Sequence, residues 1–127
     1  MLNPDIVGRT FTSAHTFTVT QESIIEFCTA IGELDFTAAP PTYTIKISLA
    51  ESEVLLKESG LNWDRVVHGD QKFELHQPIV GGDQILCSST VESARIVAGN
   101  EIVTVRSDLY RSSEHVASSW ATLVSRA

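Results

Sequence analysis

A long helical segment at residues 41–59 restricts most strongly how this chain can fold. Pro41 fits the first turn of a helix, where its missing N–H costs nothing, and Gly60 is a typical residue just beyond a last turn. The apolar residues follow the helical repeat in two neighbouring stripes, formed by Ile45, Leu49 and Leu56 and by Ile47, Ala50 and Val54. Because its first half is apolar on nearly all sides, we expect this helix to be mostly buried.

From Val66 onward the chain shows only strand patterns. The predicted strands are KFELH, PIVGGDQILCSSTVES, EIVTVRSDLYRS and HVASSWATLVS. They are separated by a corner at Gly81-Gly82 and by a turn at Gly99-Asn100. The spacing of these turn signals predicts an antiparallel meander.

The N-terminal part contributes shorter elements. Residues 15–19, HTFTV, alternate in the manner of a short strand. A helix is predicted over Gln21–Ile31, with Thr20 as its N-cap and Gly32 ending it.

These elements predict an α+β fold in a single domain spanning residues 1–127. Only the sheet is long enough to cover the central helix, so we expect a curved antiparallel sheet wrapped around it, the arrangement known as the hot-dog fold. One edge of such a sheet stays open, and we expect a dimer in which a second chain covers it.

Charge and composition exclude several classes of protein. The formal net charge is −7 and the nine Lys and Arg residues are scattered, which disfavours nucleic acid or an anionic membrane as a partner. No apolar run reaches the roughly 18–20 residues of a membrane span, and the N-terminus does not resemble a secretory signal. Cys28 and Cys87 lack the spacing of a metal or redox motif, so we expect free thiols and a cytoplasmic protein.

A polar cluster lies in the stretch Val66–Gly82, VVHGDQKFELHQPIVGG. His68 and Gln71 are costly to bury on a strand unless they are hydrogen-bonded. They can therefore line a ligand pocket, bond across a dimer seam, or lock the strand to its neighbours. Two histidines in this stretch do not make a metal site without further ligands. Asp83, directly after the stretch, is expected to cap backbone N–H groups of the Gly-Gly corner.

Several segments together resemble the MaoC-like dehydratases, most closely their N-terminal-type hot-dog module. The resemblance covers roughly Val7 to Arg126. It rests on VGRTF, the FTV strand, FCTAIGELD, the PPTYT helix start, HGDQKFELHQPIVGGD and the final strand.

The resemblance implies chemistry on acyl thioesters of coenzyme A or acyl carrier protein. Catalytic members of the family are (R)-specific enoyl hydratases or 3-hydroxyacyl dehydratases, which use no metal or redox cofactor. An Asp and a His before the long helix, in a Gly-Asp-x-Asn-Pro-x-His pattern, transfer the protons. Backbone N–H groups at the helix start polarise the thioester carbonyl. The resemblance thereby implies substrate-binding positions at Pro41, Thr42, Tyr43, His68, Gly69 and Gln71.

The chain departs from this pattern in the loop before the helix. Glu33 stands where the catalytic Asp is expected and Asp35 lies near it, so these two are the candidate catalytic residues. No histidine occurs between His15 and His68, and the loop is shorter than is usual in the family.

The resemblance and this departure predict a dehydratase or hydratase, a hydro-lyase, in which this chain is a subunit that shapes the substrate tunnel. Whether the chain is catalytic by itself stays open. Its expected partners are an acyl thioester and a second hot-dog subunit, in a homodimer or in a heterodimer with a catalytic chain. The alternatives are a homodimeric acyl-CoA thioesterase, which needs only a carboxylate, and a non-enzymatic acyl-ligand-binding module. Fold alone does not decide among them.

Overall fold

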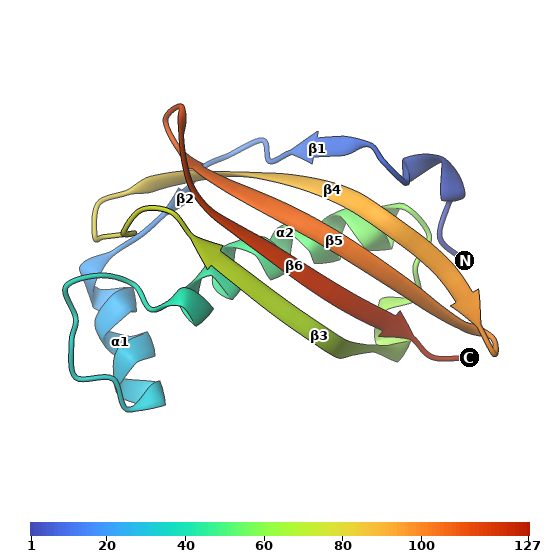
Figure 1. Ribbon diagram of the computed structural model, residues 1–127, viewed down its shortest axis with the longest axis horizontal. Coiled ribbons are helices and arrows are strands. Elements are labelled where there is room, and N and C mark those ends of the chain that lie inside the picture. Colours follow the sequence, from blue (N-terminus) through green and yellow to red (C-terminus); the bar gives the residue numbers. More distant parts are fainter.

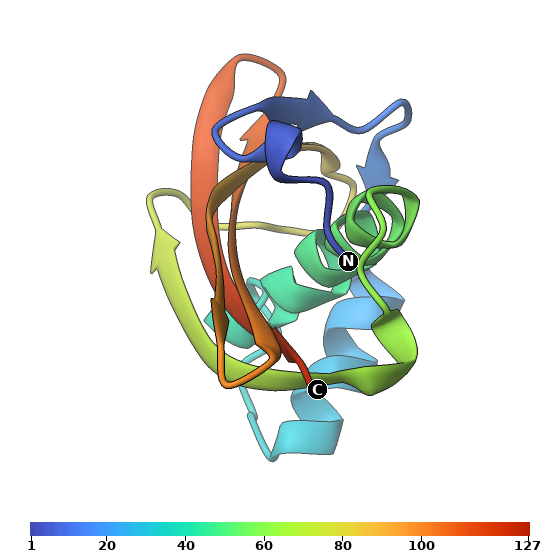
Figure 2. The same ribbon diagram turned by 90° about the vertical axis from the view of Figure 1, so that its right-hand side faces the viewer.

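The central helix lies in the concave side of one strongly curved sheet (Figures 1 and 2). The computed structural model describes residues 1–127. The helices are α1 (Gln21–Ile31) and α2 (Ile45–Glu58), with 3₁₀ turns at Pro4–Ile6, Pro41–Thr44 and Trp63–Arg65. The strands are β1 (Thr10–Thr12), β2 (Phe17–Thr18), β3 (Val66–Leu75), β4 (Gln84–Val97), β5 (Asn100–Arg111) and β6 (Glu114–Ser125). The predicted α+β hot-dog fold is confirmed.

The strand order of the six-stranded sheet is β1-β4-β5-β6-β3, with β2 also paired to β4. Every strand pair is antiparallel. The predicted meander is correct for β4, β5 and β6 but wrong for β3, which pairs with β6 and not with β4. The reason is that residues 76–83 are irregular and carry the chain from one side of the β5–β6 pair to the other. The predicted strand beginning at PIVGGD therefore begins only at Gln84.

Helix α1 has the predicted bounds and ends. The Thr20 hydroxyl accepts a hydrogen bond from the Ser23 N–H at 3.1 Å, which satisfies one of the free donors at the helix start. Gly32 ends the helix with φ +78°, a conformation that suits glycine. Ile24 and Cys28 bury the inner face of the helix against the end of the sheet.

The long helix has the predicted extent, but its first turn differs. Residues 41–44 form a 3₁₀ turn, since the Tyr43 N–H donates to the Pro40 carbonyl at 2.9 Å. Only one side of α2 is covered by the sheet, so the expectation of a mostly buried helix is wrong for its other side. Ala50 is exposed and Val54 is 54% exposed. The buried face is instead partly polar, because Ser48 and Ser52 lie on it.

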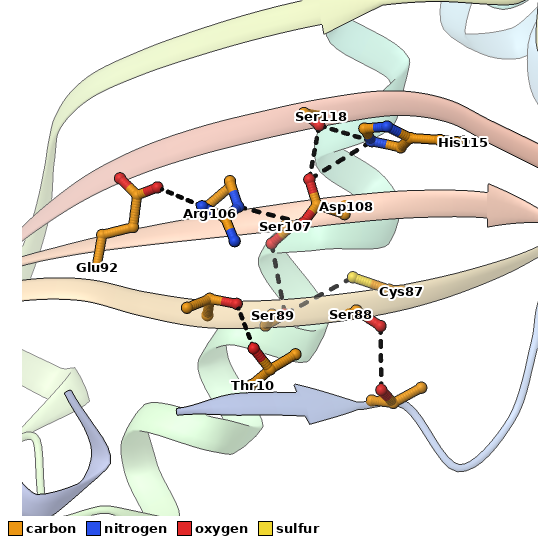
Figure 3. A network of polar contacts seen from close by, with 12 residues as sticks. Thr10, Cys87, Ser88, Ser89, Glu92, Arg106, Ser107, Asp108, His115 and Ser118 are labelled. Carbon is orange, nitrogen blue, oxygen red and sulfur yellow. Dashed lines mark hydrogen bonds and ion pairs between the residues drawn. The ribbon is translucent and has the colours of Figure 1, made fainter. Parts of the chain in front are cut away.

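A row of serines divides the core below α2. Ser89, Ser107 and Ser119 are aligned across β4, β5 and β6 and are nearly fully buried. The Ser89 and Ser107 hydroxyls lie 3.4 Å apart (Figure 3), and the Ser48 hydroxyl of α2 donates to Ser119 at 3.4 Å. The apolar core accordingly falls into two clusters, one toward α1 and one toward the N-terminus. Small hydrogen-bonded side chains allow the helix to approach the sheet closely without leaving a buried polar atom unpaired.

Strand β3 forms one edge of the sheet. It pairs with β6 on one side only, so the backbone groups along its other side have no partner strand in this chain. Such an edge is a ready template for a second chain. The structure contains no helix with both the length and the apolar character required to cross a lipid bilayer.

Candidate functional site

The loop between α1 and α2 borders a shallow depression of about 180 Å³. Its lining residues are Glu33, Asp35, Thr37, Ala38, Pro40 and Pro41. The fold thus brings both candidate catalytic carboxylates together with Pro41, the first residue of the 3₁₀ turn that leads into α2. None of the four histidines lines this depression.

Both carboxylates serve as hydrogen-bond acceptors within the loop. A Glu33 carboxylate oxygen accepts from the Asp35 N–H at 3.0 Å. Asp35 Oδ1 accepts from the Thr37 N–H at 2.9 Å and from the Thr37 hydroxyl at 2.6 Å, which is an Asx turn. The hydroxyl bond and the backbone bond from Thr37 lower the pKa of Asp35 below its usual value. Asp35 is therefore held ionised, which makes it a poor proton donor and a weak base.

Replacing Thr37 with valine should raise the pKa of Asp35 toward the ordinary value of about 3.9, because one of its two donors is lost. A folded-state pKa that is depressed stabilises the fold above the unfolded pKa, and this stabilisation disappears as pH falls through the folded value. The wild type should therefore lose the stabilisation contributed by ionised Asp35 below about pH 4. The variant should gain less stabilisation from this group at higher pH. Carbon-13 NMR titration of the carboxyl group measures the shift. An unchanged Asp35 pKa in the variant would show that Thr37 does not control this carboxylate.

The start of the long helix is divided between surface and core. Pro41 and Thr42 are exposed beside the depression, whereas the Tyr43 side chain is fully buried. The Tyr43 hydroxyl lies 2.6 Å from the Ser23 hydroxyl, and its ring meets Phe27 edge to face at 5.6 Å between centroids. Tyr43 thus joins α1 to the start of α2. The substrate-binding role assigned to Pro41, Thr42 and Tyr43 stays a prediction, and for Tyr43 it concerns the backbone, since the side chain belongs to the core.

The polar residues of β3 form a separate group away from the loop. His68 Nε2 lies 2.8 Å from the Gln71 side-chain oxygen, and the Gln71 amide donates to the Ser119 hydroxyl at 2.6 Å. Gly69 lies at an irregularity in the pairing with β6, where an added Cβ would lie 3.4 Å from the Thr122 carbonyl oxygen. These bonds lock the strand locally, while His68 remains exposed at the edge. Binding roles for His68, Gly69 and Gln71 also stay predictions.

Two groups of functional interest were not identified from the sequence. One is Thr37, although Asp-x-Thr is a recognisable Asx-turn pattern. The other is a network on the convex face of the sheet (Figure 3). There Asp108 accepts from Ser118 at 2.7 Å and from Arg106 at 3.2 Å, and His115 lies 2.8 Å from the Ser118 hydroxyl. The sequence predicted both strands, but which side chains of β5 and β6 meet depends on the register between them, which could not be read from the sequence.

The two thiols are unsuited to nucleophilic chemistry. Both cysteines are free and buried, as predicted. Burial raises the pKa of Cys87 to about 11. Burial also raises the pKa of Cys28, and the nearby charges of Glu33 and Asp35 add to this effect. Because the thiolate is the reactive form and a raised pKa disfavours it, both cysteines act as unreactive core residues.

Sequence comparisons connect the chain to a dehydratase family. The family described as "FAS1-like, dehydratase domain region" matches residues 35–119. A UPF0336 protein of Streptomyces coelicolor is 33% identical over 144 residues, covering 99% of this chain and 96% of the relative. Since that alignment is longer than the 127 residues of this chain, the relative has residues that this chain lacks.

Structural comparisons identify the fold. The C-terminally truncated HadBC (3R-hydroxyacyl-ACP dehydratase) complex of Mycobacterium tuberculosis has a chain that matches with a TM-score of 0.85 and 22% identity, covering 97% of this chain and 99% of that chain. The MaoC-like dehydratase of Rhodospirillum rubrum matches with a TM-score of 0.70 and 24% identity, covering 99% and 97%. The identities are low, so these matches show the fold alone. The chain thus belongs to the FAS1-like dehydratase domain region family, and its fold is the hot-dog fold of the MaoC-like dehydratases.

Proposed function

We propose that this chain is the non-catalytic, acyl-channel-forming subunit of a (3R)-hydroxyacyl-thioester dehydratase, and that a second hot-dog chain supplies the catalytic Asp and His. The observation that carries the proposal is the hydrogen bonding of the loop. Glu33 and Asp35 occupy the expected catalytic region, but both are acceptors for backbone N–H groups of their own loop. No imidazole lines the depression beside them.

The dehydration reaction requires a proton acceptor and a proton donor, and this loop does not supply both. Dehydration takes a proton from the α-carbon and protonates the β-hydroxyl, which leaves as water. These steps need a group that accepts a proton and a group that donates one. Asp35, whose pKa is lowered by Thr37, is unsuited to donate. Each missing group costs about 10²–10⁴ in rate, so we expect this chain alone to be inactive. In this proposal the reaction requires no metal or redox cofactor, and an acyl-CoA or acyl carrier protein thioester is the substrate.

An incomplete apolar surface supports a subunit role. Phe73 and Leu75 of β3 and Ile45 and Leu49 of α2 remain partly exposed. Gln71, on the same face of β3 as Phe73 and Leu75, is tied to the core by its bond to Ser119. That face is therefore the concave one, and the free edge of β3 adjoins it. A partner chain pairing along this edge would cover these residues and close a channel between the two chains. The HadBC dehydratase is itself a complex.

The test is hydration of crotonyl thioesters by the purified chain. We expect no turnover above background from this chain alone. A gain of at least about 10²-fold is expected when it is combined with a MaoC-like chain that carries the Asp and His pair. Robust hydration by this chain alone that is lost in Glu33→Gln would contradict the non-catalytic role.

The same assay separates the two alternatives. Release of free thiol from a panel of acyl thioesters would identify a thioesterase. A rise in melting temperature with acyl ligand, without turnover in any pairing, would identify a binding module. No observation in the structure favours either alternative over the subunit role.

A further inference from the structure

A second, larger groove lies beside the outer flank of α2. It has a volume of about 420 Å³ and is formed by α2 and the connection between β1 and β2, with β4 beneath. Its lining residues are Phe11, Thr12, Ser13, Ala14, His15, Glu51, Val54, Leu55, Glu58 and Ser89. Because β1, β2 and β4 lie on the opposite side of the sheet from β3, the groove is separate from the edge assigned above to a catalytic partner.

The α2 wall has the residue spacing of a helix-packing surface. Glu51, Val54, Leu55 and Glu58 are related as i, i+3, i+4 and i+7, which places them on one stripe of the helix. The two apolar residues form the centre of the stripe and the two acids form its ends. Val54 belongs to one of the two apolar stripes of the helix but is 54% exposed. The stripe is therefore patterned for burial, yet this chain covers it only in part: Leu55 is partly buried against the core, and Val54 is exposed.

The charge of the groove is negative and uncompensated. Glu51 and Glu58 make no ion pair, whereas the neighbouring Glu53 pairs with Lys57 at 3.3 Å. No Lys or Arg lines the groove, and His15 is its only basic side chain. The two acids are seven residues apart, or about 10 Å along the helix axis. Cations two turns apart on a facing helix would match this spacing.

We propose that this groove docks an amphipathic helix of a partner protein, with apolar residues against Val54 and Leu55 and with Lys or Arg side chains against Glu51 and Glu58. The net charge of −7 would speed the approach of such a basic segment. Helix-in-groove recognition through anchors at i, i+3, i+4 and i+7 is a common mode of peptide binding. The inference does not depend on the proposed dehydratase role, because it uses a different edge of the sheet.

The test is an NMR titration of the full chain with three synthetic peptides. The probe is a 14-residue Leu/Lys helix with one apolar stripe. Its controls are a scrambled peptide of the same composition and a Leu/Glu peptide with the same stripe. We expect the Leu/Lys helix to shift the amide signals of residues 11–15 and 51–58, and to bind at least about 10-fold more tightly than either control. Equal binding of the scrambled peptide, or shifts centred on β3, would overturn the proposal.

Matched variants test the role of the charges. Glu51→Gln with Glu58→Gln should weaken binding of the Leu/Lys helix about 10-fold or more, and should reduce its salt dependence. Glu22→Gln with Glu26→Gln on α1 changes the net charge equally and should alter affinity less than about twofold. If the two double variants weakened peptide binding equally, the binding would depend only on the net charge of the protein, and the proposed docking site would be wrong. If spermine bound to the same amides as tightly as the peptide, the groove would be a site for small cations, and the proposal would be wrong.

Discussion

Replacing Tyr43 with alanine is expected to lower the free energy of unfolding by about 3–5 kcal/mol, the usual cost of removing a buried aromatic side chain. Tyr43 is fully buried where α1 meets the start of α2. The change would remove its edge-to-face contact with Phe27 and its hydrogen bond with Ser23. The loop that carries Glu33 and Asp35 joins these same two helices, so loss of this contact should also loosen the depression. Urea unfolding monitored by circular dichroism measures the change.

Tyr43→Phe is the matched control because it retains the ring and removes only the hydroxyl. It should cost about 1 kcal/mol, the net value of one hydrogen bond. Binding of an acyl thioester should be unchanged, since the side chain does not reach the surface. A Tyr43→Phe variant of normal stability with much weaker acyl binding would instead make the Tyr43 hydroxyl a substrate contact.

The second large effect is expected from Asp83, which fixes the irregular connection between β3 and β4. One carboxylate oxygen accepts from the Val80 N–H at 2.9 Å and from the Arg111 guanidinium at 2.7 Å. The same Arg111 nitrogen also donates to the Pro78 carbonyl at 3.0 Å. The Asp83 side chain is only 11% exposed, so its removal would leave the Val80 N–H without its acceptor. The Arg111 guanidinium would lose one of its two carboxylate partners and keep the other, Glu114 at 2.6 Å. We expect Asp83→Ala to destabilise the fold by about 1–3 kcal/mol, the usual cost of leaving a buried donor unsatisfied, measured by the same unfolding experiment.

Two controls separate the role of Asp83 from a general effect of charge. Asp83→Asn retains an oxygen that can accept from Val80 but removes the negative charge, so it should cost less than alanine. Glu53→Ala removes an exposed partner of Lys57 and should cost less than about 0.5 kcal/mol. If Asp83→Ala were as mild as Glu53→Ala, the corner would not depend on this carboxylate.

Local signals predicted the elements and several of their ends. Thr20 and Gly32 delimit α1, because capping and left-handed backbone depend on single residues. Asp83 caps the corner at Val80 as expected. The hot-dog arrangement followed because one long apolar helix needs a sheet to cover it. The sequence also indicated that the loop before this helix departs from the catalytic pattern.

Relations between distant segments could not be predicted. The pairing of β3 with β6 depends on which edge of the sheet remains free after β4, β5 and β6 have paired, and the turn spacing does not contain this information. The burial of Ser48 and Ser52 in place of Ala50 and Val54 depends on which side of α2 the sheet covers. The apolar stripes alone could not distinguish the buried face of the helix from its exposed face. The hydrogen bonds of Asp35 to Thr37 are local, by contrast, and an Asx-turn pattern would have identified them.

The most direct test of the central claim is the turnover number of the reconstituted complex with its carboxylates altered in one chain at a time. The partner would be a MaoC-like chain that carries the Asp and His pair. Glu33→Gln with Asp35→Asn in this chain preserves oxygens that can accept the loop hydrogen bonds and removes both charges. We expect kcat to change less than about threefold, whereas loss of the catalytic His in the partner chain should lower it by about 10²-fold or more. A loss of that size from the Glu33 and Asp35 changes would show that this chain supplies catalytic groups, and would contradict the account.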